Sequence, residues 1–148
     1  MGNYRLEQKT FVIDNYDKLL KTFGYRKQRI LTNLVAEVIQ ELTSEETVFR
    51  YAPDQFVVLY KDKDNKEAFK HIDNIRRIIA GISFSCAPKQ QPIKITVSCS
   101  LAEKKRSDAG ALEVLINKCT YFIKNNYLPT NSCVFLSISF KRKKYAIL

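Results

Sequence analysis

Long apolar runs are missing from this sequence, and glycine and proline are scarce, with four residues of each among 148. The longest apolar stretch, Phe56–Tyr60, is too short to cross a bilayer, and residues 1–10 show no apolar signal region. Hydrophobic residues at 45% and charged residues at 27% exclude a fibrous or disordered chain. We therefore expect one globular domain over residues 1–148, without a membrane segment.

The cysteines form no C-x-x-C pair, and this absence disfavours zinc ligation by all four residues. They lie far apart in the sequence, mostly beside strand-like or helix-like apolar residues: Cys86, Cys99, Cys119 and Cys133. We expect reduced thiols in the core and a cytoplasmic location. The single histidine, His71, has no cysteine or histidine at ligand spacing, so we expect a surface or boundary residue without a catalytic role.

Basic residues outnumber acidic residues by 25 to 15, and the resulting formal net charge of +10 would favour polyanions. The charge is scattered, however. The densest clusters, Lys104–Arg106 and Lys141–Lys144, lie beside loop or terminal sequence. We interpret them as a solvated face, with residues 140–148 forming a basic C-terminal extension.

Apolar spacing predicts strands that alternate with amphipathic helices. Strands are expected at residues 4–13, 47–51, 55–60, 82–86, 93–101 and 132–139, and helices at residues 16–23, 27–42, 64–80 and 109–126. The predicted core includes Ile13, Leu34, Val38, Phe56, Val58, Ile75, Val97 and Leu115. This order predicts an α+β fold, with a central, mostly antiparallel sheet and flanking helices, of ferredoxin-like or polymerase-palm type.

Three segments resemble motifs of the GGDEF (diguanylate cyclase) domain family. Ile13–Tyr25 resembles D-x-D-x-F-K-x-I-N-D-x-Y-G-H, and Phe49–Phe56 resembles x-R-Y-G-G-D/E-E-F. Lys94–Leu101 resembles the strand V-T-x-S-x-G-V. The segments stand in the family's order, and the resemblance covers residues 10–136. It implies a nucleotidyl-cyclase fold.

The resemblance also implies a metal-dependent site that joins two GTP molecules, and here several of its residues are replaced. Val12 stands where the family has its first metal-binding aspartate, and Gln55 stands in the acidic pair of the hairpin. Both replacements remove negative charge that Mg²⁺ requires. Asp14 and Asp54 remain and could hold one weakly bound ion, although a strand-end role and a turn role also explain them.

The phosphate-binding turn and the guanine-binding residues differ as well. The degenerate motif is Ala52, Pro53, Asp54, Gln55 and Phe56. Ala52 and Pro53 replace two glycines, so the backbone loses positive φ and one N–H donor, while a type I turn remains compatible with the hairpin. Leu20 and Arg29 stand where the family reads guanine; Arg29 could still meet a phosphate. Thr43 and Glu46 replace the family's R-x-x-D inhibitory motif.

We therefore expect a catalytically inactive regulatory, nucleotide-sensing or dimerisation domain in cyclic-dinucleotide signalling, without a cofactor. Its expected ligands are GTP, ATP or a cyclic dinucleotide, bound weakly, and its expected partner is an attached or separate signalling domain or a second copy. Slow nucleotide hydrolysis, as in cyclic-di-AMP phosphodiesterases, and an atypical active cyclase are the alternatives. Specific nucleic-acid binding is not expected, because the strands lack the Gly-aromatic pattern of RNA-recognition domains.

Overall fold

The computed structural model describes residues 5–43, 47–61, 65–105, 117, 120, 121, 123, 124, 130–139 and 144–147. A six-stranded sheet forms the centre, in the order β2-β3-β1-β4-β5-β6. Its strands are β1 (Arg5–Ile13), β2 (Thr47–Ala52), β3 (Gln55–Lys61), β4 (Val97–Lys105), β5 (Cys133–Ser139) and β6 (Lys144–Ile147). All neighbours are antiparallel except β4 and β5. The predicted α+β fold is confirmed.

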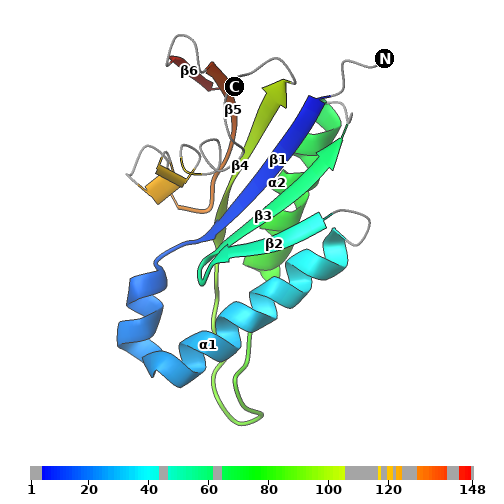
Figure 1. Ribbon diagram of the computed structural model, residues 1–148. Coiled ribbons are helices and arrows are strands. Elements are labelled where there is room, and N and C mark those ends of the chain that lie inside the picture. Colours follow the sequence, from blue (N-terminus) through cyan, green and yellow to red (C-terminus); the bar gives the residue numbers. More distant parts are fainter. Residues whose placement is uncertain are drawn as a thin grey trace.

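The first helix, α1 (Tyr16–Leu42), is interrupted at Gly24, where φ is 80° and ψ is 166°. Only glycine adopts this combination without strain, so the chain changes direction there. The two predicted helices, 16–23 and 27–42, are therefore the two arms of α1, which Figure 1 shows in two shades of blue. The short first arm leads the chain away from the sheet after the end of β1.

The second helix, α2 (Asn65–Gly81), packs on the same face of the sheet as the long arm of α1. Figure 1 shows α2 behind the sheet and α1 crossing beneath β2. The buried apolar stripe of α1 contains Leu31, Val35 and Ile39, spaced four residues apart as on one face of a helix. Together with Ile72 and Ile75 of α2, this stripe packs against alternate residues of the strands. These side chains form a single buried core.

Five of the predicted core residues are buried: Ile13, Phe56, Val58, Ile75 and Val97. Leu34 and Val38 are only half-buried, because the stripe that faces the sheet lies one position further along the helix. Leu115 and Cys119 lie outside the described residues. Of the other cysteines, Cys99 is buried, Cys86 and Cys133 are half-buried, and all three are unpaired thiols.

The predicted strands at 82–86 and 93–101 are wrong in their bounds. Between α2 and β4 only Phe84 and Ile93 pair, through an isolated bridge, and β4 begins at Val97. Pro88 and Pro92 fall between the paired residues and cannot donate to a ladder, so this segment leaves the sheet. Residues 144–147, expected within a basic extension, form β6. Within the described part of 109–126, residues 117, 120, 121, 123 and 124 are helical, as predicted.

None of the helices in the described ranges is both long and apolar enough to traverse a bilayer.

Candidate functional site

The hairpin between β2 and β3 turns at Pro53 and Asp54. Neither residue has positive φ: among the described residues only Asn15, Gly24 and Asn131 do. Two-residue hairpin loops normally use positive φ to match the twist of the strands, and the pairing register here shifts between Arg50 and Ala52 instead. The hairpin thus persists without glycine, as expected, by means of a local irregularity.

Asp14 follows β1 directly, and its carboxylate accepts three hydrogen bonds from the protein. Oδ2 accepts from the Thr96 hydroxyl at 2.6 Å and from the Asn131 backbone N–H at 2.7 Å, and Oδ1 accepts from the Ser98 hydroxyl at 2.7 Å. Its own N–H donates to the Thr96 carbonyl at 3.0 Å. Asp14 therefore ties the end of β1 to the start of β4 and to the turn before β5.

A residue in a hairpin turn is expected to be exposed, but Asp54, which lies in this turn, is only 8% exposed. Its carboxylate Oδ2 lies 2.9 Å from Nζ of Lys124, and its backbone carbonyl accepts from Ile13 N–H at 2.8 Å. Pro53 is exposed and Ala52 is half-buried. The Asp54 charge is thus compensated by a lysine from a distant helical segment.

The two residues expected from the sequence to replace metal ligands are both buried on the opposite face of the sheet from α1 and α2. Val12 is 4% exposed and Gln55 is 1% exposed, and the Gln55 amide donates to the Thr120 hydroxyl. Within the described ranges no three His, Cys, Asp or Glu side chains gather in a way that could hold a metal ion. The residues therefore do not fit the divalent metal that the family's reaction uses.

A cavity of about 730 Å³ opens beside these groups, where β1 ends and α1 begins. Three lysines line it, Lys18 and Lys21 from α1 and Lys124 from the helical segment, together with three aspartates, Asp14, Asp17 and Asp54. Asn15, which precedes α1 and also lines the cavity, makes no side-chain capping bond, so the N–H groups of the first turn receive no hydrogen bond from that side chain. Lysines and a helix N-terminus together suit an anion such as a phosphate.

A second cavity, of about 470 Å³, lies between α1 and the hairpin. Its walls include Tyr16, Tyr25, Tyr51, Arg29 and Arg50. The Arg50 guanidinium bonds Asn33 Oδ1 at 2.6 Å, Thr32 Oγ1 at 3.1 Å and the Pro53 carbonyl at 2.9 Å. It also lies 5.5 Å from the ring centre of Phe56. These contacts make Arg50 a brace for the turn.

Tyr16 borders both cavities. Burial raises the pKa of its phenol above the ordinary value, and the neighbouring Asp54 carboxylate raises it further. The phenol therefore stays protonated at neutral pH and can donate a hydrogen bond to a ligand.

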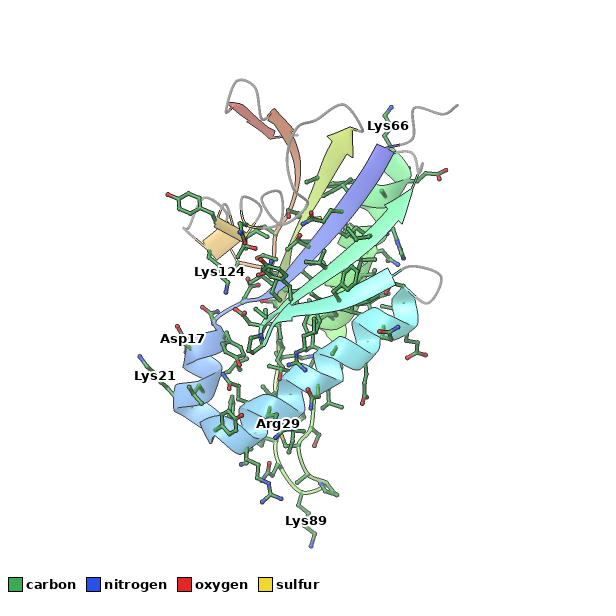
Figure 2. All side chains as sticks on the ribbon, in the orientation of Figure 1. Asp17, Lys21, Arg29, Lys66, Lys89 and Lys124 are labelled. Atoms are coloured by element: carbon green, nitrogen blue, oxygen red, sulfur yellow. The ribbon has the colours of Figure 1, made fainter. Side chains whose placement is uncertain are left out.

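The structure brings Asp14 and Asp54 to the same cavity but places Arg29 on the other one, exposed on α1 (Figure 2). In Figure 2 Asp17, Lys21 and Lys124 share one edge of the molecule. Leu20 is 40% exposed.

His71 is half-buried, as a boundary residue: its Nδ1 lies 2.7 Å from Lys9 Nζ and its Nε2 lies 3.1 Å from the Leu42 carbonyl.

The sequence did not reveal several residues that line the two cavities: Lys18, Lys124 and the three tyrosines Tyr16, Tyr25 and Tyr51. Lys124 lies 70 residues from the aspartate that it pairs with, so no local pattern reveals it. Thr43 is buried and its hydroxyl donates to the Ile39 carbonyl at 2.6 Å, which makes it part of the end of α1. Glu46 lies outside the described residues.

A mostly antiparallel sheet with two helices on one face, and a hairpin and a helix start beside one cavity, define a nucleotidyl-cyclase-type domain. The family model "Diguanylate cyclase, GGDEF domain" matches residues 10–126. The chain therefore belongs to the GGDEF domain family. None of the curated proteins matches it.

Solved GGDEF domains share this fold. The active GGEEF domain of a diguanylate cyclase from Vibrio cholerae is 18% identical, with a TM-score of 0.73 over 88% of this chain and 82% of that one. The GGDEF domain of DgcB from Caulobacter crescentus, solved with c-di-GMP, is 16% identical, with a TM-score of 0.77 over 89% and 78%. An EAL/GGDEF domain protein from M. capsulatus is 23% identical, with a TM-score of 0.75 over 90% and 85%.

Proposed function

We propose that this GGDEF domain makes no cyclic di-GMP and instead regulates cyclic-dinucleotide signalling by binding nucleotide phosphates without a divalent metal. One observation carries the proposal: both aspartates that remain at the site are engaged by the protein. Asp14 accepts three hydrogen bonds and Asp54 pairs with Lys124. A metal ion would have to displace these donors, and Val12 and Gln55 offer no charge to offset the loss.

The phosphate-binding half of the proposal rests on Lys18, Lys21 and Lys124. All three are exposed, line the larger cavity and approach the uncapped start of α1. An incoming phosphate can compete with Asp54 for Lys124, because both are anions and the lysine side chain is 43% exposed. Nucleotide binding would then loosen the contact between the hairpin and the helical segment. That change is the proposed signal to an attached or partner domain, or to a second copy.

The site favours phosphate over base recognition. Leu20 and Arg29 cannot present the acceptors that would select guanine, so GTP and ATP should bind alike and weakly. DgcB was solved with c-di-GMP, and a cyclic dinucleotide is accordingly one ligand to test. The proposal treats residues 1–148 as a single domain whose basic end is 140–148, and places it in the cytoplasm, where nucleotides are present.

The test of inactivity is to incubate the purified chain with GTP and Mg²⁺ or Mn²⁺ and to separate the products by chromatography. No cyclic di-GMP is expected, and the variant Gln55→Glu should remain inactive because Val12 and the Pro53 turn are unchanged. Cyclic di-GMP from the wild-type chain would overturn the proposal. Formation of GDP from GTP would instead indicate the alternative, slow nucleotide hydrolysis.

The test of metal-free binding is calorimetry of GTP and ATP with and without Mg²⁺. We expect similar affinities for the two nucleotides that fall together as salt rises. Lys124→Gln should weaken binding, whereas Asp54→Asn should strengthen it by releasing Lys124. Lys70→Gln, on the exposed face of α2, is the matched control. A tight GTP complex that requires Mg²⁺ and Asp14 would refute metal-free binding.

A further inference from the structure

Two segments without a single acidic residue meet at one end of the molecule. Residues 24–36 belong to α1, and residues 82–96 connect α2 to β4. The thiol of Cys86 lies 4.0 Å from the Lys27 carbonyl, so the segments are in contact. Together they carry five cations, which we call the basic pole: Arg26, Lys27, Arg29, Lys89 and Lys94. Figure 2 shows Arg29 and Lys89 at this end and Lys66 at the opposite end.

The charge of the basic pole is not compensated within the part of the chain that the structure describes. None of its five cations forms an ion pair there, and four of them are exposed, Lys27 being half-buried. Lys94 Nζ donates to the Gly81 carbonyl at 3.3 Å, but this acceptor is uncharged, so the positive charge of Lys94 is not compensated. Five cations gathered without counter-charge create a positive potential that attracts an anionic surface.

Apolar side chains stand among these cations. Tyr25 is 70% exposed and Ile30 is 36% exposed. Tyr25 and Arg29, and Arg26 and Ile30, are each four residues apart in the helical arm, so each pair lies together on the exposed side of α1. An aromatic ring and an aliphatic tip among basic residues are typical of helices that lie in a membrane interface.

We propose that the basic pole docks this domain onto a bilayer surface that contains anionic phospholipid. Lipid fits better than nucleic acid, because an exposed isoleucine gains by entering the acyl boundary and has no counterpart along a phosphate backbone. Contact would be peripheral and reversible, since each cation near such a surface strengthens binding about fivefold and the potential fades within a Debye length. The proposal is independent of nucleotide binding.

The first experiment measures co-sedimentation of the chain with phosphatidylcholine vesicles, with and without about 30% phosphatidylserine. Binding should require phosphatidylserine and disappear at high salt. The double variant Arg26→Glu, Lys89→Glu should lose more than tenfold in partitioning. Lys66→Glu, Lys70→Glu on α2 makes the same change in net charge at the other end and should lose far less. Circular dichroism confirms that both variants fold.

The second experiment exploits the absence of tryptophan from the chain. Tyr25→Trp places a single tryptophan beside the basic pole, and Phe49→Trp, at a site 45% exposed on β2, is the control. Anionic vesicles should shift the emission of the first variant to the blue and leave the second unchanged. Equal binding to both vesicle types, equal losses in the two charge variants, or binding to double-stranded RNA in place of vesicles would each overturn the proposal.

Discussion

Replacing Asp14 with alanine tests whether this aspartate is a structural anchor or the remnant of a metal site. The substitution leaves three donors without their acceptor: the hydroxyls of Thr96 and Ser98 and the backbone N–H of Asn131. A hydrogen bond to a charged group contributes about 1.5 to 3 kcal/mol. Asp14 is only half-buried and the hydroxyls can turn to other acceptors, so we expect a total loss of about 3 kcal/mol.

Asparagine at the same position should cost much less. Its carbonyl oxygen can accept from Thr96 and Asn131 in place of Oδ2, and its amide can donate to Ser98, whose hydroxyl can rotate to accept. Only the charge is lost, which should cost about 1 kcal/mol. The predicted order of stability is therefore wild type, Asp14→Asn and then Asp14→Ala.

Urea denaturation measures this order. With an m value of about 1.5 kcal/mol/M, a loss of about 3 kcal/mol lowers the midpoint by about 2 M. Asp17→Ala, at an exposed site in the first turn of α1, is the control and should change the free energy of unfolding by less than about 1 kcal/mol. If Asp14→Ala is as stable as this control, or if Mg²⁺ stabilises the wild type through Asp14, the anchor role is wrong.

Three further predictions concern groups outside the cavity. An added Cβ meets nothing within 4 Å at either Gly24 or Gly81, so only backbone conformation distinguishes the two sites. Gly24→Ala should destabilise the fold by about 1 to 3 kcal/mol in urea because φ of Gly24 is 80°, whereas Gly81→Ala should be nearly neutral. His71→Ala should cost about 2 kcal/mol in the same assay, because the buried Lys9 loses a hydrogen-bond partner. Burial raises the pKa of the Cys99 thiol, so a thiol reagent at neutral pH should modify Cys99 only after unfolding.

The fold could be predicted because most elements carry their own periodicity. Leu31, Val35 and Ile39 recur at helical spacing, and the alternation along β1 and β3 sets one face of each strand against the helices. The strand prediction failed at residues 82–96, because Phe84 and Ile93 have strand propensity while the prolines between them limit the pairing to a single bridge. No local sequence pattern predicted β6, which pairs with β5, the strand just before it in the sequence.

The site was predictable only where it follows a linear motif. Val12, Pro53 and Gln55 stand at motif positions, so their altered chemistry could be read directly from the sequence. The partners of Asp14 left a weaker signal. Thr96, just before β4, and Ser98, within it, alternate with apolar residues, and two such hydroxyls at the buried start of a strand require an acceptor. The pairing of Asp54 with Lys124 depends on tertiary structure alone.

Under the proposal that this site binds no metal, the two remaining aspartates explain how the fold persists without one. Carboxylates gathered for a cation repel one another and are costly to bury once the cation is gone. Here Gln55 and Val12 reduce the number of carboxylates, Lys124 supplies a tethered cation to Asp54, and neutral donors satisfy Asp14. Each replacement lowers the need for the metal, and all of them together make its return unfavourable. Restoring one metal ligand should therefore destabilise the domain without restoring cyclase activity. Gln55→Glu, for example, would bring a second negative charge beside Asp54 and is expected to give no activity.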